Sequence, residues 1–151
     1  MALNQELLGR TYPSAPPYVV GREKVREFAR AVGETSPLSL DVDAARAAGY
    51  TDVVAPPTFA IALSLEAGHA AAFDPELGLD YTRVVHGEQR FEYTRPIVAG
   101  DELIATASIH AIREAAGNDM LTTRVDISDS NGAHVCTTYS VLVARAKGEG
   151  E

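Results

Sequence analysis

Four runs in the second half of the chain alternate strand-forming residues with polar ones, and this pattern constrains the fold most strongly. The runs are "EQRFEYT" (88–94), "ELIATASIHAI" (102–112), "LTTRVDIS" (121–128) and "HVCTTYSVLVA" (134–144). Alternation with a period of two is typical of strands that have one buried face. The connections carry turn residues, including a strong hairpin signal at Asn131-Gly132. The sequence therefore predicts an antiparallel meander.

The first half of the chain has helical patterns instead. Apolar residues recur at helical spacing in "REKVREFARAV" (22–32), and Gly33 follows as a plausible C-terminal stop. Asp41 or Asp43 is expected to cap a short helix over "AARAAGY" (44–50). The preceding "YVV" (18–20) suits a short first strand, and the polar segment "GETSPLSLD" (33–41) is expected to be a loop.

A third helix is predicted over 58–73, where the sequence is apolar on nearly all sides. Pro56 and Pro57 suit its start, because the first N–H groups of a helix lack intrahelical partners. A curved antiparallel sheet wrapped around this long apolar helix would satisfy both halves of the chain. We therefore expect an α+β hotdog fold, formed by a single domain over 1–146 and followed by a flexible C-terminal tail at 147–151.

Composition excludes several classes of function. The net charge of −8 disfavours nucleic-acid binding, which depends on Lys and Arg side chains at phosphates. Cys136 is the only cysteine and is expected to be a reduced thiol buried in a strand. The histidines lack metal-pair spacing, so neither a metal nor another cofactor is expected. The sequence shows no leader and no apolar run long enough for a membrane span, and we expect a cytoplasmic protein.

Three stretches resemble the MaoC-type hydratase and dehydratase family, and together they cover nearly the whole chain. They are "FARAVGETSPLSLDVDAARAAGYTDVVAPPTF", "VVHGEQRFEYTRPIVAGDEL" and the final strands ending in "YSVLVARA". The second stretch is the most specific. The chain is most similar to the non-catalytic, substrate-binding subunit of heterodimeric (3R)-hydroxyacyl-carrier-protein dehydratases, the FAS1-like dehydratase N-terminal type.

The resemblance implies a loop that has lost its catalytic residues. Active members of the family carry Asp-x-Asn-Pro-x-His, and these positions fall on Glu34, Ser36, Pro37 and Ser39. A neutral imidazole can remove the proton next to a thioester carbonyl, whereas a serine hydroxyl without an adjacent base cannot. Only the proline is kept, so we predict no intact catalytic residue in this loop.

A second departure lies at the start of the central helix. Active members place there a glycine whose N–H holds the thioester oxygen, and this position falls on Pro57, which has no N–H. Loss of one such donor typically costs about 2.7–4 kcal/mol of transition-state stabilisation. Thr58 keeps an N–H. We predict that Thr58, Phe59, His86 and Gly87 contact the substrate.

The implied function is a non-catalytic subunit of a (3R)-hydroxyacyl thioester dehydratase or trans-2-enoyl thioester hydratase in fatty-acid metabolism. It would bind an acyl-CoA or an acyl carrier protein thioester, while a MaoC-like catalytic partner subunit supplies the Asp and His. The two sheets would join edge to edge, and a homodimer could form when the chain is alone. The charged helix over 22–32 could instead dock an acidic carrier protein through Arg22, Lys24 and Arg26.

Three alternatives remain open at this point. One is an active homodimeric hydratase that uses Glu34 with His86 or Glu88. Another is a hotdog thioesterase, for which Glu66 is the only acidic residue in the predicted central helix. The third is a non-enzymatic acyl-thioester binding protein.

Overall fold

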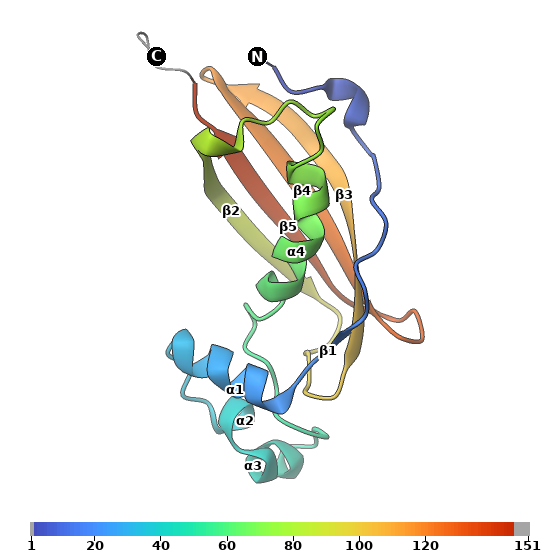
Figure 1. Ribbon diagram of the computed structural model, residues 1–151. Coiled ribbons are helices and arrows are strands. Elements are labelled where there is room, and N and C mark those ends of the chain that lie inside the picture. Colours follow the sequence, from blue (N-terminus) through green and yellow to red (C-terminus); the bar gives the residue numbers. More distant parts are fainter. Residues whose placement is uncertain (1, 147–151) are drawn as a thin grey trace.

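One antiparallel sheet makes up the second half of the protein, as the alternating pattern predicts (Figure 1). The structure is a computed structural model that describes residues 2–146. The strand order is β1-β3-β4-β5-β2, and all neighbours are antiparallel. The long strands are β2 (Val84–Tyr93), β3 (Glu102–Ala115), β4 (Asn118–Asp129) and β5 (His134–Ala144). Strand β2 thus begins at Val84, earlier than the predicted run.

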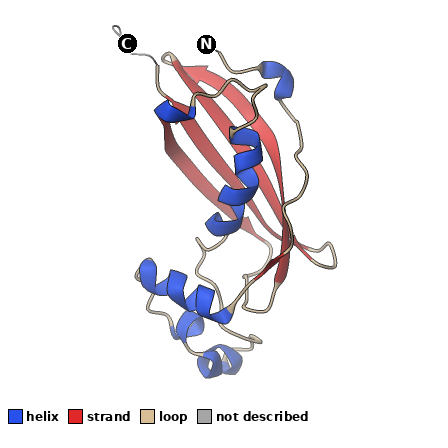
Figure 2. Ribbon diagram, viewed as in Figure 1, coloured by secondary structure: helices blue, strands red, loops and turns tan. Residues whose placement is uncertain are grey.

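Helix α4 (Ile61–Ala72) lies across the concave face of this sheet, where it packs mainly on β3 and β4 (Figures 1 and 2). Its buried face, with Leu63 and Ala67, joins a core that includes Leu103 and Val125 from the strands. Cys136 belongs to the same core and is fully buried, as expected. A curved sheet around one apolar helix confirms the predicted hotdog fold.

The predicted start of the central helix is wrong. The helix begins at Ile61, and the residues after Pro56 form a turn in which Phe59 N–H donates to the Pro56 carbonyl at 2.9 Å. This turn brings Phe59 into the core, where its exposed fraction is 0% and its ring meets Phe28 edge to face at 5.3 Å. Burial of this aromatic ring outweighs the local preference for a helix directly after proline.

Three short helices lie together at one end of the sheet (Figure 1). They are α1 (Arg22–Ala31), α2 (Pro37–Leu40) and α3 (Val42–Ala47). Helix α1 matches the prediction, and Gly33 follows it with a left-handed φ of 74°. Asp41 caps α3 by accepting from the N–H groups of Asp43 and Ala44, so the helix starts before the predicted 44–50.

Helix α2 was not expected, because the sequence analysis treated 33–41 as a loop. Ser36 is its N-cap and accepts a hydrogen bond from Leu38 N–H at 3.3 Å, while Pro37 occupies the first turn. A capping serine followed by proline is a helix-start signal, and the single turn that results is too short to show helical periodicity.

The N-terminal segment covers the β3 edge of the sheet (Figure 1). It contains the short helix η1 (Gln5–Leu7) and strand β1 (Tyr18–Val19), which pairs with β3. Between them, Tyr12 N–H donates to Ala107 and Ala15 N–H donates to Ala105, both on β3. A second short helix, η2 (Tyr81–Arg83), leads into β2. The predicted flexible tail at 147–151 lies outside the described residues.

Candidate binding cleft

A cleft of about 420 Å³ opens where α2 meets the turn before α4 and the end of β2. Its size falls within the range of small-molecule sites, and its walls are mainly apolar. The lining residues are Glu34, Ser36, Leu38, Ser39, Val54, Ala55, Pro56, Pro57, Tyr93, Thr94, Arg95, Pro96 and Ile97. The structure thus brings the residues predicted as the degenerate loop and the predicted donor position, Pro57, to one cavity.

Glu34 and Ser36 are engaged in shaping the loop. A Glu34 carboxylate oxygen accepts from Ser36 N–H at 2.8 Å, and the Ser36 hydroxyl accepts from Leu38 N–H. Both side chains are half-buried. Such bonds to nearby main-chain groups define a turn and a helix cap, so the polar atoms of this loop already have structural partners.

Ser39 has become a buried structural residue. Its exposed fraction is 4%, and its hydroxyl donates to the Val54 carbonyl at 2.6 Å. Val54 N–H donates in turn to the Leu38 carbonyl at 2.8 Å. This pair of bonds ties α2 to the segment that leads to α4. A hydroxyl held by a carbonyl acceptor has no base beside it to take its proton.

The predicted substrate contacts near α4 lie in different environments. Pro57 and Thr58 are exposed, and Pro57 lines the cleft. Phe59 is fully buried in the core beneath the cleft. Contact of Thr58 and Phe59 with a substrate stays a prediction.

Tyr93 is a cleft residue that the sequence analysis missed. Its hydroxyl donates to the Pro57 carbonyl at 2.6 Å and so links the end of β2 to the turn before α4. Burial raises the pKa of Tyr93 above its ordinary value, and a main-chain N–H at Ala60 acts in the opposite direction. The hydroxyl therefore stays neutral. The alternating pattern could have indicated Tyr93, because it occupies the last inward-facing position of the predicted strand 88–94.

Two further polar residues line the cleft beyond Tyr93. The Thr94 hydroxyl is hydrogen-bonded to Nδ1 of His134. Arg95 donates to both carboxylate oxygens of Asp101, at 2.8 and 3.1 Å, and also to the Pro96 carbonyl. Each of the polar side chains that line the cleft thus has a partner within the chain. The cleft offers an apolar surface with few uncommitted polar groups.

His86 and Gly87 lie away from the cleft. His86 is exposed, and its Nε2 is 3.0 Å from the Glu88 carbonyl. Both residues line a separate open hollow on β2. His86 is seven residues before Tyr93 on the same strand, which corresponds to roughly 20 Å. The structure therefore does not bring Glu34 and His86 together.

Gly87 marks a β-bulge in β2. The pairing with β5 skips it, because His86 faces Leu142 and Glu88 faces Val141. A Cβ at this position would lie 3.0 Å from the Val143 Cγ2 atom and 3.4 Å from the Val141 carbonyl oxygen. The close approach of β5 explains why a glycine occupies this site.

The acidic residues of the alternative hypotheses are also distant from the cleft lining. Glu88 lies beside Arg90 and His110 on the outer face of the sheet. Glu66 projects from α4 toward a different hollow formed with Pro16, Pro17 and Leu103. Neither carboxylate lines the cavity that contains Glu34.

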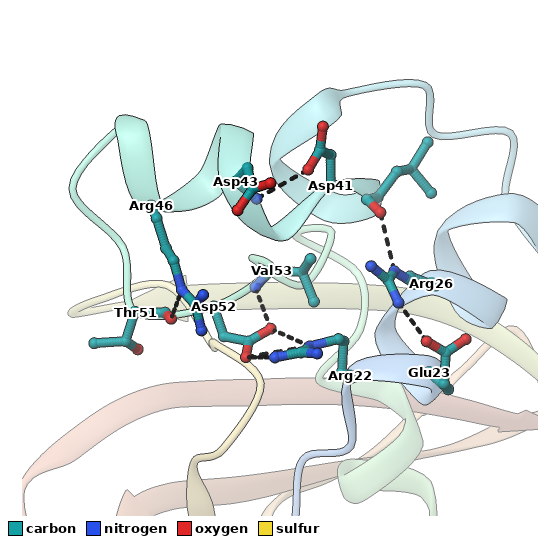
Figure 3. Close-up of polar contacts among 10 residues, drawn as sticks. Arg22, Glu23, Arg26, Asp41, Asp43, Arg46, Thr51, Asp52 and Val53 are labelled. Atoms are coloured by element: carbon teal, nitrogen blue, oxygen red, sulfur yellow. Dashed lines mark hydrogen bonds and ion pairs between the residues drawn. The ribbon is translucent and has the colours of Figure 1, made fainter.

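Two cations of α1, Arg22 and Arg26, make contacts within the helical end (Figure 3). Arg22 binds the Asp52 carboxylate, at 2.9 Å from Nε and 2.7 Å from Nη2. Arg26 donates to the Leu40 carbonyl at 2.9 Å and pairs with Glu23. The Arg22 guanidinium lowers the pKa of Asp52 to about 2. These bonds fix α1 against α2 and the 50–53 segment. Lys24, the third cation predicted for docking, lies 3.7 Å from Glu27 on the same helix.

Residues 2–146 hold neither a candidate metal cluster nor a helix that could span a membrane. No three His, Cys, Asp or Glu side chains gather there in a way that could hold a metal ion. None of the helices in this part of the chain is long and apolar enough to span a membrane.

A curved antiparallel sheet around one central helix places this protein in the class of hotdog-fold proteins. The chain belongs to the FAS1-like dehydratase domain region family, whose model matches residues 6–138. It is 53% identical over 150 residues to a UPF0336 protein of Streptomyces avermitilis. The matched region covers 99% of this chain and 100% of that protein. A UPF0336 protein of Thermobifida fusca is 50% identical over 145 residues, which cover 96% of this chain and 95% of that protein.

Solved structures support the same family. A MaoC-like dehydratase superposes with a TM-score of 0.86 at 38% identity over 93% of this chain, which spans 42% of the length of that protein. A chain of the HadBC (3R-hydroxyacyl-ACP dehydratase) complex from Mycobacterium tuberculosis gives 0.81 at 34% identity, with 91% of this chain and 96% of that chain covered.

Proposed function

We propose that this protein is the non-catalytic, substrate-binding subunit of a (3R)-hydroxyacyl thioester dehydratase or trans-2-enoyl thioester hydratase. The observation that carries the proposal is the state of the polar groups in the cleft. Glu34, Ser36 and Ser39, which stand at the family's catalytic loop positions, all bond to main-chain groups. The loop keeps its shape, and the groups left in it hold the loop together.

The reaction itself requires groups that this cleft does not offer. Dehydration removes a proton from the carbon next to the thioester carbonyl, which calls for a base with a suitable pKa within hydrogen-bond reach. Ser39 is buried against a carbonyl, and His86 is roughly 20 Å along β2 from the cleft. Glu34 is the only carboxylate on the lining, and one of its oxygens is held by Ser36 N–H.

The cleft nevertheless suits an acyl thioester as a ligand. Val54, Ala55, Pro56 and Ile97 supply apolar walls, and the cavity of about 420 Å³ can take a flexible apolar chain. We expect the carrier to be CoA or an acyl carrier protein. Thr58 is exposed beside Pro57 and is our choice for a contact near the thioester.

The free edge of the sheet supports a partner of the same fold. The β3 edge is covered by β1 and the N-terminal segment. Within residues 2–146, no strand pairs with the outer side of β2. Uncovered edges attract another strand, and natural proteins rarely leave a long one open. Addition of a hotdog partner at β2 would extend the sheet, consistent with the HadBC complex found for one structural relative.

An apolar patch beside this edge would be buried by the same partner. It consists of Leu65 and Phe73 on α4 and Tyr81 on η2, with exposed fractions between 42% and 56%. The Phe73 and Tyr81 rings pack together with centroids 4.4 Å apart. We call this surface the edge patch. A contiguous apolar surface next to an open strand is typical of an interface between subunits.

Reconstitution with a catalytic partner tests the proposal. The chain is assayed for hydration of a trans-2-enoyl thioester alone and after co-expression with a MaoC-like protein that carries Asp-x-Asn-Pro-x-His. We expect a stable complex, no turnover by the chain alone, and a change in the partner's rate or acyl-length preference on mixing. Robust turnover by the chain alone, or the absence of any complex with such partners, would contradict the proposal.

The second candidate is a non-enzymatic acyl-thioester binding protein, which the occupied polar groups of the cleft also support. The two candidates predict different results in one part of the reconstitution experiment. A pure binding protein would retain the thioester without changing the activity of any MaoC-like partner.

A further inference from the structure

The N-terminal segment runs along β3 and uses the hydrogen-bonding groups of that strand's outer edge. Gly9, Tyr12 and Ala15 donate their N–H groups to carbonyls of β3 at 2.9, 2.9 and 3.1 Å. Strand β1 continues the pairing to the first residue of β3. We call residues 9–20 the edge strap (Figure 1). It covers the edge of β3 over 102–109.

The edge strap repeats every three residues, whereas a strand repeats every two. Tyr12, Ala15 and Tyr18 are half-buried, and the residues between them are exposed. A period of three is that of a polyproline II helix, which forms no internal hydrogen bonds. The strap therefore bonds to β3 without becoming a regular strand over most of its length. A further strand, with its period of two, would not match it.

The outer side of the strap offers few hydrogen-bond donors over 13–17. Pro13, Pro16 and Pro17 have no N–H, and the N–H of Ala15 already donates to β3. Ser14 is the one residue of this stretch whose N–H is left for a strand from outside. Proline at a sheet edge is one of the devices by which natural proteins prevent pairing with another chain.

Side chains anchor the strap to the rest of the domain. Arg10 Nη1 binds the Asp74 carboxylate at 3.0 Å and also pairs with Glu76. The Tyr12 hydroxyl donates to Asp74 at 2.7 Å, and the Asp74 side chain is only 8% exposed. Leu7, just before the strap, is buried in the core beside β3. The strap is thus a fixed part of the domain.

Strand β2, at the opposite edge of the sheet, lacks this protection. It runs for ten residues without a proline, so each residue carries an N–H. A single bulge at Gly87 interrupts its pairing with β5. Within residues 2–146, no strand pairs with its outer side. The two edges therefore differ: the strap has three prolines in five residues, and β2 has none.

We propose that the edge strap excludes a second copy of this chain from the β3 side, so that the sheet can be extended only through β2. Subunits that each have one joining edge form an assembly that closes at two subunits. With a joining edge on each side, further copies could add to form an open-ended assembly. The strap thus sets one partner per chain at the sheet edges. The joining of subunits at β2 rests on the proposed function.

The test restores N–H groups to the strap and measures the size of the full chain by sedimentation velocity. Pro13→Thr, Pro16→Thr and Pro17→Thr are combined, because threonine supplies an N–H and favours strands. Wild type should stay at or below two subunits at every concentration. The triple variant should gain about two-fold or more in mass at high concentration. Pro75→Thr is the matched control, because Pro75 is exposed in the turn after α4, away from both edges.

Two further variants separate edge pairing from misfolding. Val19 is 65% exposed on β1, and a lysine at an exposed edge opposes pairing. Val19→Lys added to the triple variant should therefore return it to wild-type size. Pro13→Thr alone is the milder change, and it should give a smaller gain in mass if circular dichroism shows that the triple variant does not fold.

A folded proline variant that keeps wild-type size, or wild type that grows beyond two subunits, would overturn the proposal. The change Phe73→Glu in the edge patch separates this failure from that of the proposed function. Association that stops at pairs in the Phe73→Glu background, but continues further without this change, supports both. An equal gain in both backgrounds supports the role of the strap and contradicts the joining of subunits at β2.

Discussion

The Ser39 hydroxyl donates to the Val54 carbonyl at 2.6 Å, in the position where catalytic relatives are expected to carry histidine. The bond is partly buried and joins α2 to the chain that enters α4. It gives the residue a structural purpose that is independent of catalysis. In this chain the loop that resembles a catalytic motif therefore has a structural role in the walls of the cleft.

Removal of this hydroxyl should destabilise the protein. Ser39→Ala leaves a partly buried carbonyl without its side-chain donor, and loss of a hydrogen-bond partner in the interior typically costs about 1–3 kcal/mol. Urea unfolding should show a lower midpoint with an unchanged slope. Ser14→Ala is the matched control, because the Ser14 hydroxyl meets Thr106 at the exposed surface. Equal urea midpoints for Ser39→Ala and Ser14→Ala would contradict a stabilising role of the Ser39 hydroxyl.

Gly87→Ala should weaken the β2 edge. The new Cβ would lie 3.0 Å from Val143 Cγ2, so β5 or the bulge must shift, at a cost of about 1–3 kcal/mol. Gly21→Ala offers a control with similar chemistry, since its Cβ would find only Lys24 Cβ at 3.9 Å. Thermal melting of both variants, with hydrogen exchange across 84–93, checks the result. A Gly87→Ala protein as stable as Gly21→Ala would show that the bulge tolerates a side chain.

The Arg22–Asp52 pair should make the free energy of unfolding depend on pH. Arg22 lowers the pKa of Asp52 to about 2, below the value of about 3.9 for an unfolded chain. The folded state is therefore stabilised above the unfolded pKa, and this contribution is lost as pH falls from about 5 toward 2. Because Arg22 is 44% exposed, we expect less than about 1 kcal/mol.

Asp52→Asn should flatten the dependence of unfolding free energy on pH in this window. Asp43→Asn serves as the control, because Asp43 has an exposed carboxylate in the first turn of α3. Urea unfolding at several pH values between 2.5 and 6 gives the comparison. An identical pH profile for wild type and Asp52→Asn would contradict the role of the pair.

Phe73→Glu should disrupt association without unfolding the chain. Phe73 is 56% exposed in the edge patch, and burial of a phenylalanine contributes about 1.5–3 kcal/mol. The dissociation constant of a complex formed through this surface should rise by about 10-fold or more, as measured by sedimentation equilibrium. Val32→Glu is the control, with a 53% exposed side chain at the end of α1. Equal effects of the two changes would place the interface elsewhere.

Much of the fold could be predicted from the sequence because its signals are local and repeated. Period-two alternation located the four long strands, and apolar spacing with Gly33 located α1. The start of α4 could not be predicted, because burial of Phe59 against Phe28 is a tertiary effect that overrides the proline signal. Helix α2 is one turn long and gave no periodicity, although its Ser36-Pro37 cap was visible.

The site was partly predictable. The loop alignment placed Glu34, Ser36, Ser39 and Pro57 together, and they do line one cleft. His86 was predicted to contact the substrate, yet it lies near the start of β2 and lines a separate hollow instead of the cleft. The Thr94–His134 contact was missed because the bulge at Val135, which aims His134, leaves no mark in the alternating pattern.

The central claim is that this cleft binds an acyl thioester without hydrating or dehydrating it. One measurement tests it directly: titration of the purified chain with a trans-2-enoyl thioester, with bound ligand and enoyl absorbance followed in the same sample. The account predicts saturable binding, reduced by a bulky substitution at Ala55 on the cleft wall, and no loss of the enoyl signal. Hydration by the chain alone, abolished in Glu34→Gln, would contradict the account and make Glu34 a catalytic residue.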